Sequence, residues 1–184
     1  MPDQPEKSPT ISWKSKLKPV VETIQMIAMA LVLYFLIDSV VARVRVQKIS
    51  MEPTLVPGEV LLVNKLAYTF GEIEHGDIIT FHYPMEPDLD YVKRVVGKPG
   101  DEVIVREGDV WVNNQALYEP YISAAPEYEG VWDVPEDALF VLGDNRNNSN
   151  DSHHGWTVLR KDIIGKAWLS TWPPVEWRLI PDYY

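Results

Sequence analysis

Residues 90–103 read DYVKRVVGKPGDEV and carry the pattern that decides the fold. Valines stand at 92, 95 and 96 in a run of β-branched and aromatic residues that is typical of a strand. The run ends at Pro99-Gly100-Asp101, which supplies the fixed and permissive backbone angles of a turn. Because alternate residues of a strand face opposite sides, Lys93 and Val95 are predicted to share one face.

The same succession of short strand-like runs and turns continues on both sides of this stretch. The runs are bounded by turn signals at 57–58, 75–77, 107–109 and 113–114. We therefore predict a mainly β fold, an antiparallel sheet or partly open barrel. A Pro-rich stretch, 118–135, interrupts the strands and is expected to lie on the surface without a chemical role. The predicted strands are 44–46, 60–63, 78–81, 91–96, 103–105, 110–112 and 139–142.

An apolar segment precedes the β region. Residues 20–42 read VVETIQMIAMALVLYFLIDSVVA, close to the roughly 20 residues that cross a bilayer. Glu22 and Asp38 lie near its two ends, where ionisable groups reach water at modest cost. We predict one N-terminal transmembrane helix. A cleavable secretory signal and a buried helix of a soluble domain are the alternatives.

Basic residues flank this segment on both sides. Lys14, Lys16 and Lys18 precede it and Arg43 and Arg45 follow, so the positive-inside rule favours a cytoplasmic amino terminus. The expected location is the plasma membrane, crossed once. The predicted organisation is a cytoplasmic segment 1–19, an anchor 20–43 and an extracytoplasmic β domain 44–184, in which 106–138 is an excursion from the main sheet.

Composition excludes several classes of protein. The chain is 46% hydrophobic and 11% aromatic, so it can build a packed core. It has no cysteine, which excludes disulfide scaffolds, thiolate metal sites and cysteine nucleophiles. After residue 45 it holds 11 basic and 23 acidic residues, a balance that repels nucleic acid.

Two residues in separate motifs are candidates for catalysis. Ser50 lies in ISMEPTL, 49–55, before a Pro53-Thr54 bend that can expose it. A serine nucleophile needs a base to accept its proton and amide donors to stabilise the oxyanion. Lys93 becomes such a base if its face is buried, because desolvation lowers the amine pKa from about 10.4 towards neutrality.

A polar loop, VLGDNRNNSNDSHHGW at 141–156, is the third motif. Its Asp and Asn residues favour bracing of turns, and Asp144 or Asp151 is expected to pair with Arg146. One alternative is a Ser/His/Asp triad that joins His153 or His154 to Ser50. The other is a calcium loop, without the glycine and distal glutamate of an EF-hand, at Asn145, Asn147, Ser149 and Asp151.

Taken in order, the apolar segment and four motifs resemble type I signal peptidases, the membrane enzymes that remove signal peptides from exported proteins. The motifs are ISMEPTL (49–55), GDIITF (76–81), YVKRVVGKPGD (91–101) and GDNRNNSNDS (143–152). The resemblance implies a serine endopeptidase with Ser50 as nucleophile and Lys93 as general base, which uses no metal or other cofactor. Its implied partners are the lipid bilayer and preproteins with Ala-x-Ala cleavage sites.

The resemblance also implies supporting roles. The Ser50 amide would form part of the oxyanion hole and Ser149 would orient the Lys93 amine. The substrate would extend along residues 76–81 and pair with that strand. Bracing would come from Asp144, Arg146 and Asp151, and substrate contacts from Met51, Ile78, Ile79, Phe81 and Tyr91. Two positions depart from the family: Lys48 stands where some members have a hydroxyl, and His153 where an arginine often follows Asp-Ser.

The anchor also bears on function. Seven residues separate Ala42 from Ser50, so the nucleophile lies within about 25 Å of the bilayer even if that chain is extended. Most of the seven tryptophans are expected in the core, with headgroup contacts by Trp168, Trp172 and Trp177 as the alternative. Two other functions remain open: a non-catalytic anchored domain that binds peptides or calcium, and a soluble self-cleaving repressor, which the apolar segment disfavours.

Overall fold

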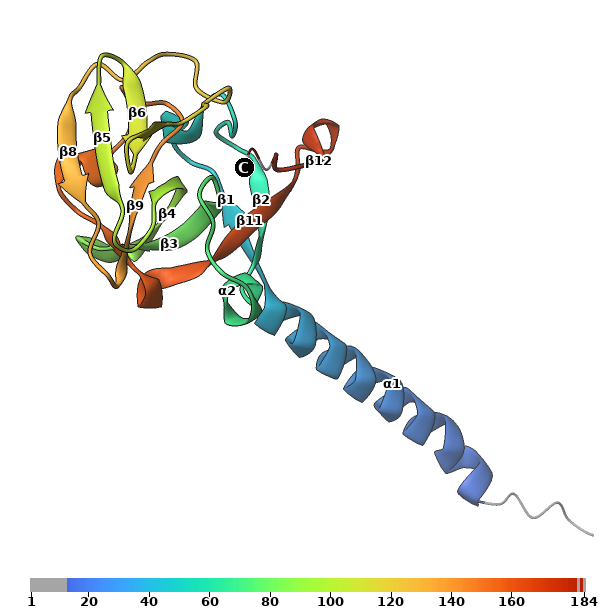
Figure 1. Ribbon diagram of the computed structural model, residues 1–184. Helices are drawn as coiled ribbons and strands as arrows, with labels where there is room; N and C mark the ends of the chain where they lie inside the picture. Colours follow the sequence, from blue (N-terminus) through green and yellow to red (C-terminus); the bar gives the residue numbers. More distant parts are fainter. Residues whose placement is uncertain (1–12, 182, 184) are drawn as a thin grey trace, which may run out of the picture. The chain divides into compact units, whose positions relative to one another are not determined.

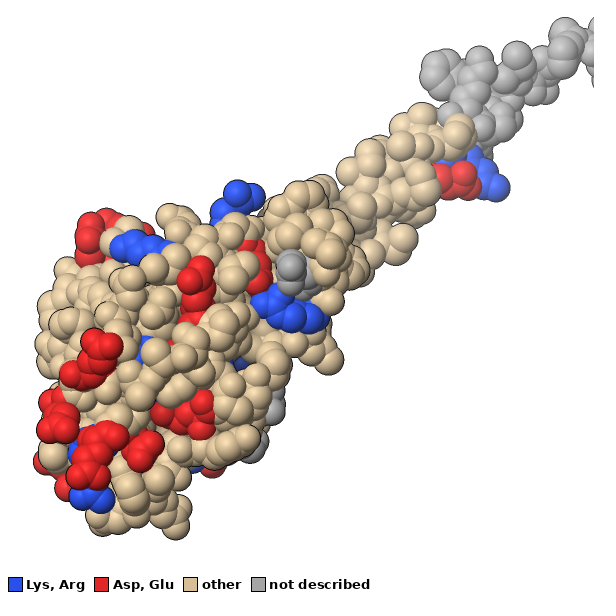
Figure 2. Space-filling model, turned by 90° about the horizontal axis from the view of Figure 1, so that it is seen from above, with Lys and Arg blue, Asp and Glu red and all other residues tan. Residues whose placement is uncertain are grey.

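The structure, a computed structural model, describes residues 13–181 and 183 and contains two compact units, 1–39 and 40–184. The described part of the first unit lies in α1 (Trp13–Val40), and Leu17–Val40 contains an 18-residue stretch with a mean hydropathy of 2.2 and no buried residue. The middle of this helix shows no charged side chain in Figure 2. This segment is long and apolar enough to span a bilayer, and its exposure argues against a buried helix of a soluble domain.

Two hydroxyl groups of α1 are satisfied within the helix. Thr23 Oγ1 donates to Pro19 O at 2.8 Å and Ser39 Oγ donates to Leu36 O at 2.7 Å. Neither hydroxyl therefore needs water, which suits a helix surrounded by hydrocarbon. The helix ends at Val40, so residues 41–43 of the predicted anchor belong to the second unit as the start of β1 (Val41–Arg45).

The second unit is built on two antiparallel sheets, which confirms the mainly β prediction (Figure 1). The large sheet has the order β1-β2-β11-β3-β4-β9-β10, with β12 paired to β11, and it does not close into a barrel. The small sheet has the order β7-β6-β5-β8. Besides β1, the large sheet contains β2 (Val60–Asn64), β3 (Ile78–Tyr83), β4 (Glu86–Gly97), β9 (Ala138–Leu142), β10 (Val158–Leu159), β11 (Ile163–Trp172) and β12 (Arg178–Leu179).

The small sheet follows the turn chemistry of the sequence. Its strands are β5 (Glu102–Arg106), β6 (Asp109–Val112), β7 (Gln115–Ala116) and β8 (Gly130–Asp133). Two-residue turns join β5 to β6 and β6 to β7, and all four turn residues have positive φ: Glu107 at 53°, Gly108 at 84°, Asn113 at 50° and Asn114 at 64°. Such angles match the twist of a hairpin, and glycine and asparagine tolerate them best.

Strand β9 connects the two parts of the core. All five of its residues are buried. Leu139 and Val141 pack into a cluster with Phe81 and Trp156, whereas Phe140 and Leu142 pack into a second cluster with the valines of β5 and β6. Because alternate residues of a strand point to opposite faces, β9 contributes side chains to both clusters. A third cluster, which contains Met51, Leu55 and Ile78, lies next to the chain around Ser50.

Two regions differ from expectation. The Pro-rich stretch 118–135 contains β8, which pairs with β5 and extends the small sheet, and its Tyr121 is only 3% exposed and lies against Arg94. Trp156 is in the core as expected, but the three tryptophans near the carboxyl end are not. Their exposed fractions are 39% for Trp168, 53% for Trp172 and 66% for Trp177.

Candidate active site

Ser50 lies in a short 3₁₀ turn, η1 (Ile49–Met51), on the path from β1 to β2. The amide of Leu55 donates to Met51 O at 2.8 Å and closes the next turn of chain. Met51 and Leu55 are 1% and 0% exposed and pack into the third core cluster. These buried apolar side chains hold the turn in place, and Ser50 beside Met51 remains partly exposed.

Lys93 reaches the Ser50 hydroxyl from β4. In the sheet register Lys93 is the partner of Ile79 of β3, and it is only 3% exposed. The Nζ atom lies 2.7 Å from Ser50 Oγ and also donates to Val92 O at 3.1 Å. The fold therefore brings together the two residues that the sequence predicted as nucleophile and base.

The surroundings of Lys93 favour its neutral form. Desolvation by burial is the largest effect and lowers the pKa of Lys93 from 10.5 to about 8. The carboxylates of Asp151 and Asp144 oppose this shift, and the ammonium of Lys48 assists it. A useful fraction of Lys93 is thus unprotonated near neutral pH, as a general base requires.

A cleft of about 1030 Å³ lies over this pair. One wall is the chain 43–51, which runs from β1 to the Ser50 turn, and the opposite wall is 88–93 of β4. Among the described residues, β1 pairs only with β2, and 88–92 pairs with no strand other than β3. Each wall therefore presents a backbone edge that no other strand covers.

The predicted substrate contacts fall into two groups. Met51 and Tyr91 line the cleft, whereas Ile78, Ile79 and Phe81 are at most 2% exposed and lie in the core clusters. Strand β3 pairs with β4 along one edge and with β11 along the other, so it has no edge for a substrate strand. The apolar run 78–81 is that of an inner strand, which sequence alone did not distinguish from a cleft wall.

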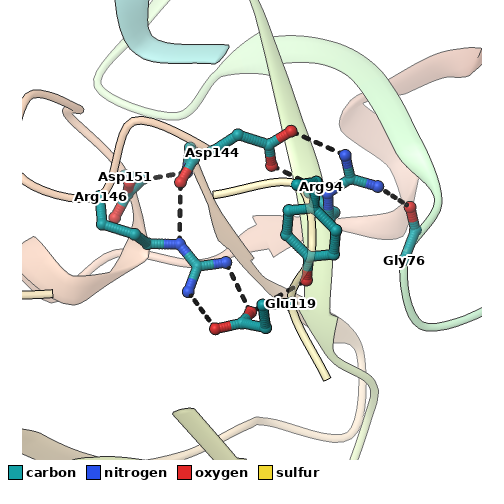
Figure 3. Close-up of polar contacts among 8 residues, drawn as sticks. Gly76, Arg94, Glu119, Asp144, Arg146 and Asp151 are labelled. Carbon is teal, nitrogen blue, oxygen red and sulfur yellow. Dashed lines mark hydrogen bonds and ion pairs between the residues drawn. The ribbon is translucent and has the colours of Figure 1, made fainter. Parts of the chain in front are cut away.

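Arg94, the neighbour of Lys93, belongs to a buried network of ion pairs (Figure 3). Its Nε and Nη2 atoms donate to Asp144 Oδ1 and Oδ2 at 2.8 and 2.7 Å, and Nη1 donates to Gly76 O at 2.9 Å. The Tyr121 ring centroid lies 3.8 Å from Arg94 Cζ. Neither charged side chain is exposed, so the bidentate geometry compensates for the lost hydration.

Arg146 pairs with Glu119, and not with Asp144 or Asp151 as predicted (Figure 3). Its Nη1 and Nη2 atoms donate to Glu119 at 2.8 and 2.7 Å. Burial alone would lower the pKa of Arg146, but the Glu119 carboxylate raises it above its ordinary range. Sequence reasoning missed Glu119, because nothing local distinguishes it from the exposed acidic residues of the Pro-rich stretch.

Asp151 braces the polar loop through both of its oxygens. Oδ2 accepts from the Gly143 amide at 2.8 Å, and Oδ1 lies 2.6 Å from His153 Nδ1. His153 therefore pairs with Asp151, and the hydrogen bond of Ser50 Oγ is to Lys93. This arrangement is not the Ser/His/Asp triad of the alternative reading.

Ser149 lines the cleft but makes no hydrogen bond to Lys93. Its Oγ is buried without a hydrogen-bond partner among the described residues. Gly143 allows this loop to approach Ser50 closely, because a Cβ at position 143 would overlap with Ser149 Oγ and with Ser50 O. Gly143 is thus a site residue that the motif contains but that sequence reasoning did not single out.

Asn145 and Asn147, which the sequence offered as possible calcium ligands, bind backbone groups through their side chains. Asn145 Nδ2 donates to Ile49 O at 3.2 Å. Asn147 Nδ2 donates to Ala125 O at 2.9 Å, and its Oδ1 accepts from the Glu127 amide at 2.8 Å. These bonds join the polar loop to the Ser50 turn and to the Pro-rich stretch, so the two side chains act as braces.

Comparisons with known proteins show which proteins this chain is similar to. A family model described as signal peptidase, peptidase S26, matches residues 20–172. A signal peptidase I from Leptolyngbya laminosa is 42% identical over 182 residues, 94% of this chain and 89% of the relative. One from Bacillus caldolyticus is 40% identical over 139 residues, 67% of this chain and 75% of the relative. A crystal structure of a signal peptidase I from Enterococcus faecalis V583 shares 27% identity, with a TM-score of 0.48, over 52% of this chain and 96% of that chain.

Proposed function

This chain belongs to the signal peptidase family, peptidase S26, and we propose that its hydrolysis of preproteins is carried out by Ser50 as nucleophile and Lys93 as general base. The protein is a membrane signal peptidase I. The observation that carries the proposed mechanism is the 2.7 Å contact between Ser50 Oγ and the buried Lys93 Nζ.

The reaction has two halves that use the same amine. Neutral Lys93 accepts the Ser50 hydroxyl proton while Oγ attacks the scissile carbonyl carbon. The ammonium then protonates the leaving amine as the C–N bond breaks, and an ester remains on Ser50. Lys93, neutral again, accepts a proton from water as that water attacks the ester, and it passes this proton to Ser50 Oγ as the C–O bond breaks, which releases the acid product and restores the free hydroxyl.

Stabilisation of the oxyanion and orientation of the amine come from nearby groups. The Ser50 amide supplies one donor to the developing negative charge. Ser149 orients the amine once Lys93 is neutral, since its buried Oγ lines the same cleft and lacks another partner in the described part of the chain. Asp144, Arg146 and Asp151 brace the surrounding backbone.

The substrate lies extended between the two uncovered edges of the cleft, residues 43–48 and 88–92, and pairs with their backbones. In an extended chain the first and third residues before the cut point to the same side. These two side chains enter the cleft between Met51 on one wall and Tyr91 on the other, and we expect this space to accept small side chains of the Ala-x-Ala kind.

Topology follows from the anchor and the exposed aromatic groups. The amino terminus lies in the cytoplasm and the β body outside it, with α1 in the plasma membrane. Trp168, Trp172 and Trp177 lie at headgroup level, where amphipathic rings are favoured. Tethering of enzyme and signal peptide to one bilayer raises their effective concentration. Protease digestion of sealed, right-side-out vesicles should therefore remove the body and spare α1.

The dyad is tested with Ser50→Ala and Lys93→Ala, each assayed in detergent on a preprotein. Cleavage should fall by about 10⁴-fold or more in both variants, because nucleophile and base act as one unit. Lys161→Ala, at an exposed lysine that does not line the cleft, is the control and should cleave normally. Near-normal cleavage by either dyad variant would favour the non-catalytic binding domain instead.

A further inference from the structure

One cluster of side chains at the cleft has no part in the proposed reaction. Asp151, His153 and His154 each place one potential ligand atom within 4.8 Å of the other two. His153 and His154 line the same cleft as Ser50 and Lys93. We propose that these three residues form a binding site for a divalent transition-metal ion of the Zn²⁺ kind, and that an ion bound there inhibits cleavage.

The geometry of the cluster is close to that of a metal site. Tetrahedral Zn²⁺ with bonds of about 2.0–2.1 Å holds its ligand atoms roughly 3.3 Å apart. In the cluster, Asp151 Oδ1 lies 2.6 Å from His153 Nδ1, and the two imidazole centroids are 3.8 Å apart. His154 is exposed, so we expect its ring to turn and shorten the remaining distances, which are at most 4.8 Å. The ion would replace the proton now shared by Asp151 and His153.

The surrounding chain holds two of the ligands in place. Asp151 caps the short helix η2 (Ser152–His154) by accepting from the His153 amide at 3.3 Å, and its other oxygen accepts from Gly143. The Tyr128 ring stacks on His153 with a centroid distance of 4.0 Å and an interplanar angle of 12°. Ligands that are ordered before the ion arrives lose less entropy on binding, which favours affinity.

The ligand types select the metal. Two imidazoles and one carboxylate suit Zn²⁺, Co²⁺, Ni²⁺ or Cu²⁺, whereas Mg²⁺ and Ca²⁺ prefer sites made of oxygen atoms. Three protein ligands leave one coordination position open. Because His153 and His154 line the cleft, we expect that position to open into it, so that its water, or a substrate carbonyl that replaces the water, would obstruct the extended chain. The site regulates the cleft and supplies nothing to the dyad's chemistry.

Binding is measured first, without reference to cleavage. Co²⁺ is titrated into the full chain in detergent, and the visible absorption of the tetrahedral ion is recorded. The wild type and the inactive Ser50→Ala variant should both bind one ion in this form, and Mg²⁺ should not compete. His154→Ala should weaken binding by about tenfold or more. His82→Ala is the matched control, because His82 of β3 lies outside the cluster and forms an exposed pair, at 2.9 Å, with Asp90 of β4.

Inhibition is measured as the ratio of cleavage rates with and without Zn²⁺, so each variant serves as its own reference. Wild type and His82→Ala should slow by about tenfold once the site is filled and should recover with a chelator, whereas His154→Ala and His153→Gln should keep most of their metal-free rate. Equal affinity for Co²⁺ in wild type and His154→Ala, or equal inhibition of these two proteins by Zn²⁺, would overturn the proposal. Since Ser50→Ala is used for binding, failure of the metal site is distinguishable from failure of the dyad.

Discussion

Lys93 and Arg94 are adjacent cations on β4, both buried, and they differ in whether a carboxylate binds them directly. Arg94 faces Asp144 through two short hydrogen bonds and lies against an aromatic ring. Lys93 forms no ion pair with a carboxylate of the described residues, and its Nζ contacts a hydroxyl and a carbonyl. One face of the strand thus holds a cation with a hydrogen-bonded carboxylate, and the other face holds a cation on which carboxylates act only from a distance.

The difference shows how burial can serve structure on one face and chemistry on the other. A guanidinium keeps its proton at any pH a protein meets, so a buried arginine needs a permanent counterion. A buried lysine can lose its proton, and the pKa of Lys93 falls to about 8 for that reason. Substitutions at these two positions should therefore change stability and activity in different ways.

The largest effect on stability is expected from Asp144→Asn. This change leaves the Arg94 charge buried without its counterion and should cost about 3–5 kcal/mol in the free energy of unfolding, measured with urea. Glu74→Gln is the matched control, because it breaks the more exposed pair with Lys98 and should cost less than about 1 kcal/mol. Equal costs for the two variants would show that burial does not distinguish these pairs.

Lys93→Met should abolish cleavage but stabilise the fold. The folded pKa of about 8 lies below the unfolded value of 10.5, so protonated Lys93 destabilises the folded state at pH 7 by about 3 kcal/mol. The gain from Lys93→Met should be complete below pH 8 and should fade as the pH rises to the unfolded value. Thermal unfolding from pH 6 to pH 10.5 measures this, and a gain independent of pH would contradict it.

The smallest expected effect is a shift of the pH profile in Lys48→Gln. In the wild type, kcat/KM should rise with pH through about 8, as Lys93 loses its proton. Lys48 lowers the pKa of Lys93, so its removal should raise that pKa and move the rise to higher pH. Lys161→Gln, at an exposed lysine outside the cleft, should leave the profile in place. A shift towards lower pH in Lys48→Gln would contradict the electrostatic role.

Much of the fold was predictable because it depends on local patterns. Period-two runs, and turns such as Glu107-Gly108 and Asn113-Asn114, specify hairpins through the angles that neighbouring residues allow. The pattern was less informative for 78–81, where an apolar run fits any inner strand. It was also insufficient for 118–135, where burial of Tyr121 depends on distant partners.

The sequence by itself determined the β class, the apolar helix and the two motifs that contain Ser50 and Lys93, since each rests on residues close together in the chain. Tertiary structure decided which cation received a carboxylate. Lys93 meets a serine 43 positions away and Arg94 meets an aspartate 50 positions away. Glu119 found Arg146 across 27 positions. Such pairings depend on how the strands are arranged in space and on how deeply the side chains are buried. The periodicity of the local sequence predicts neither.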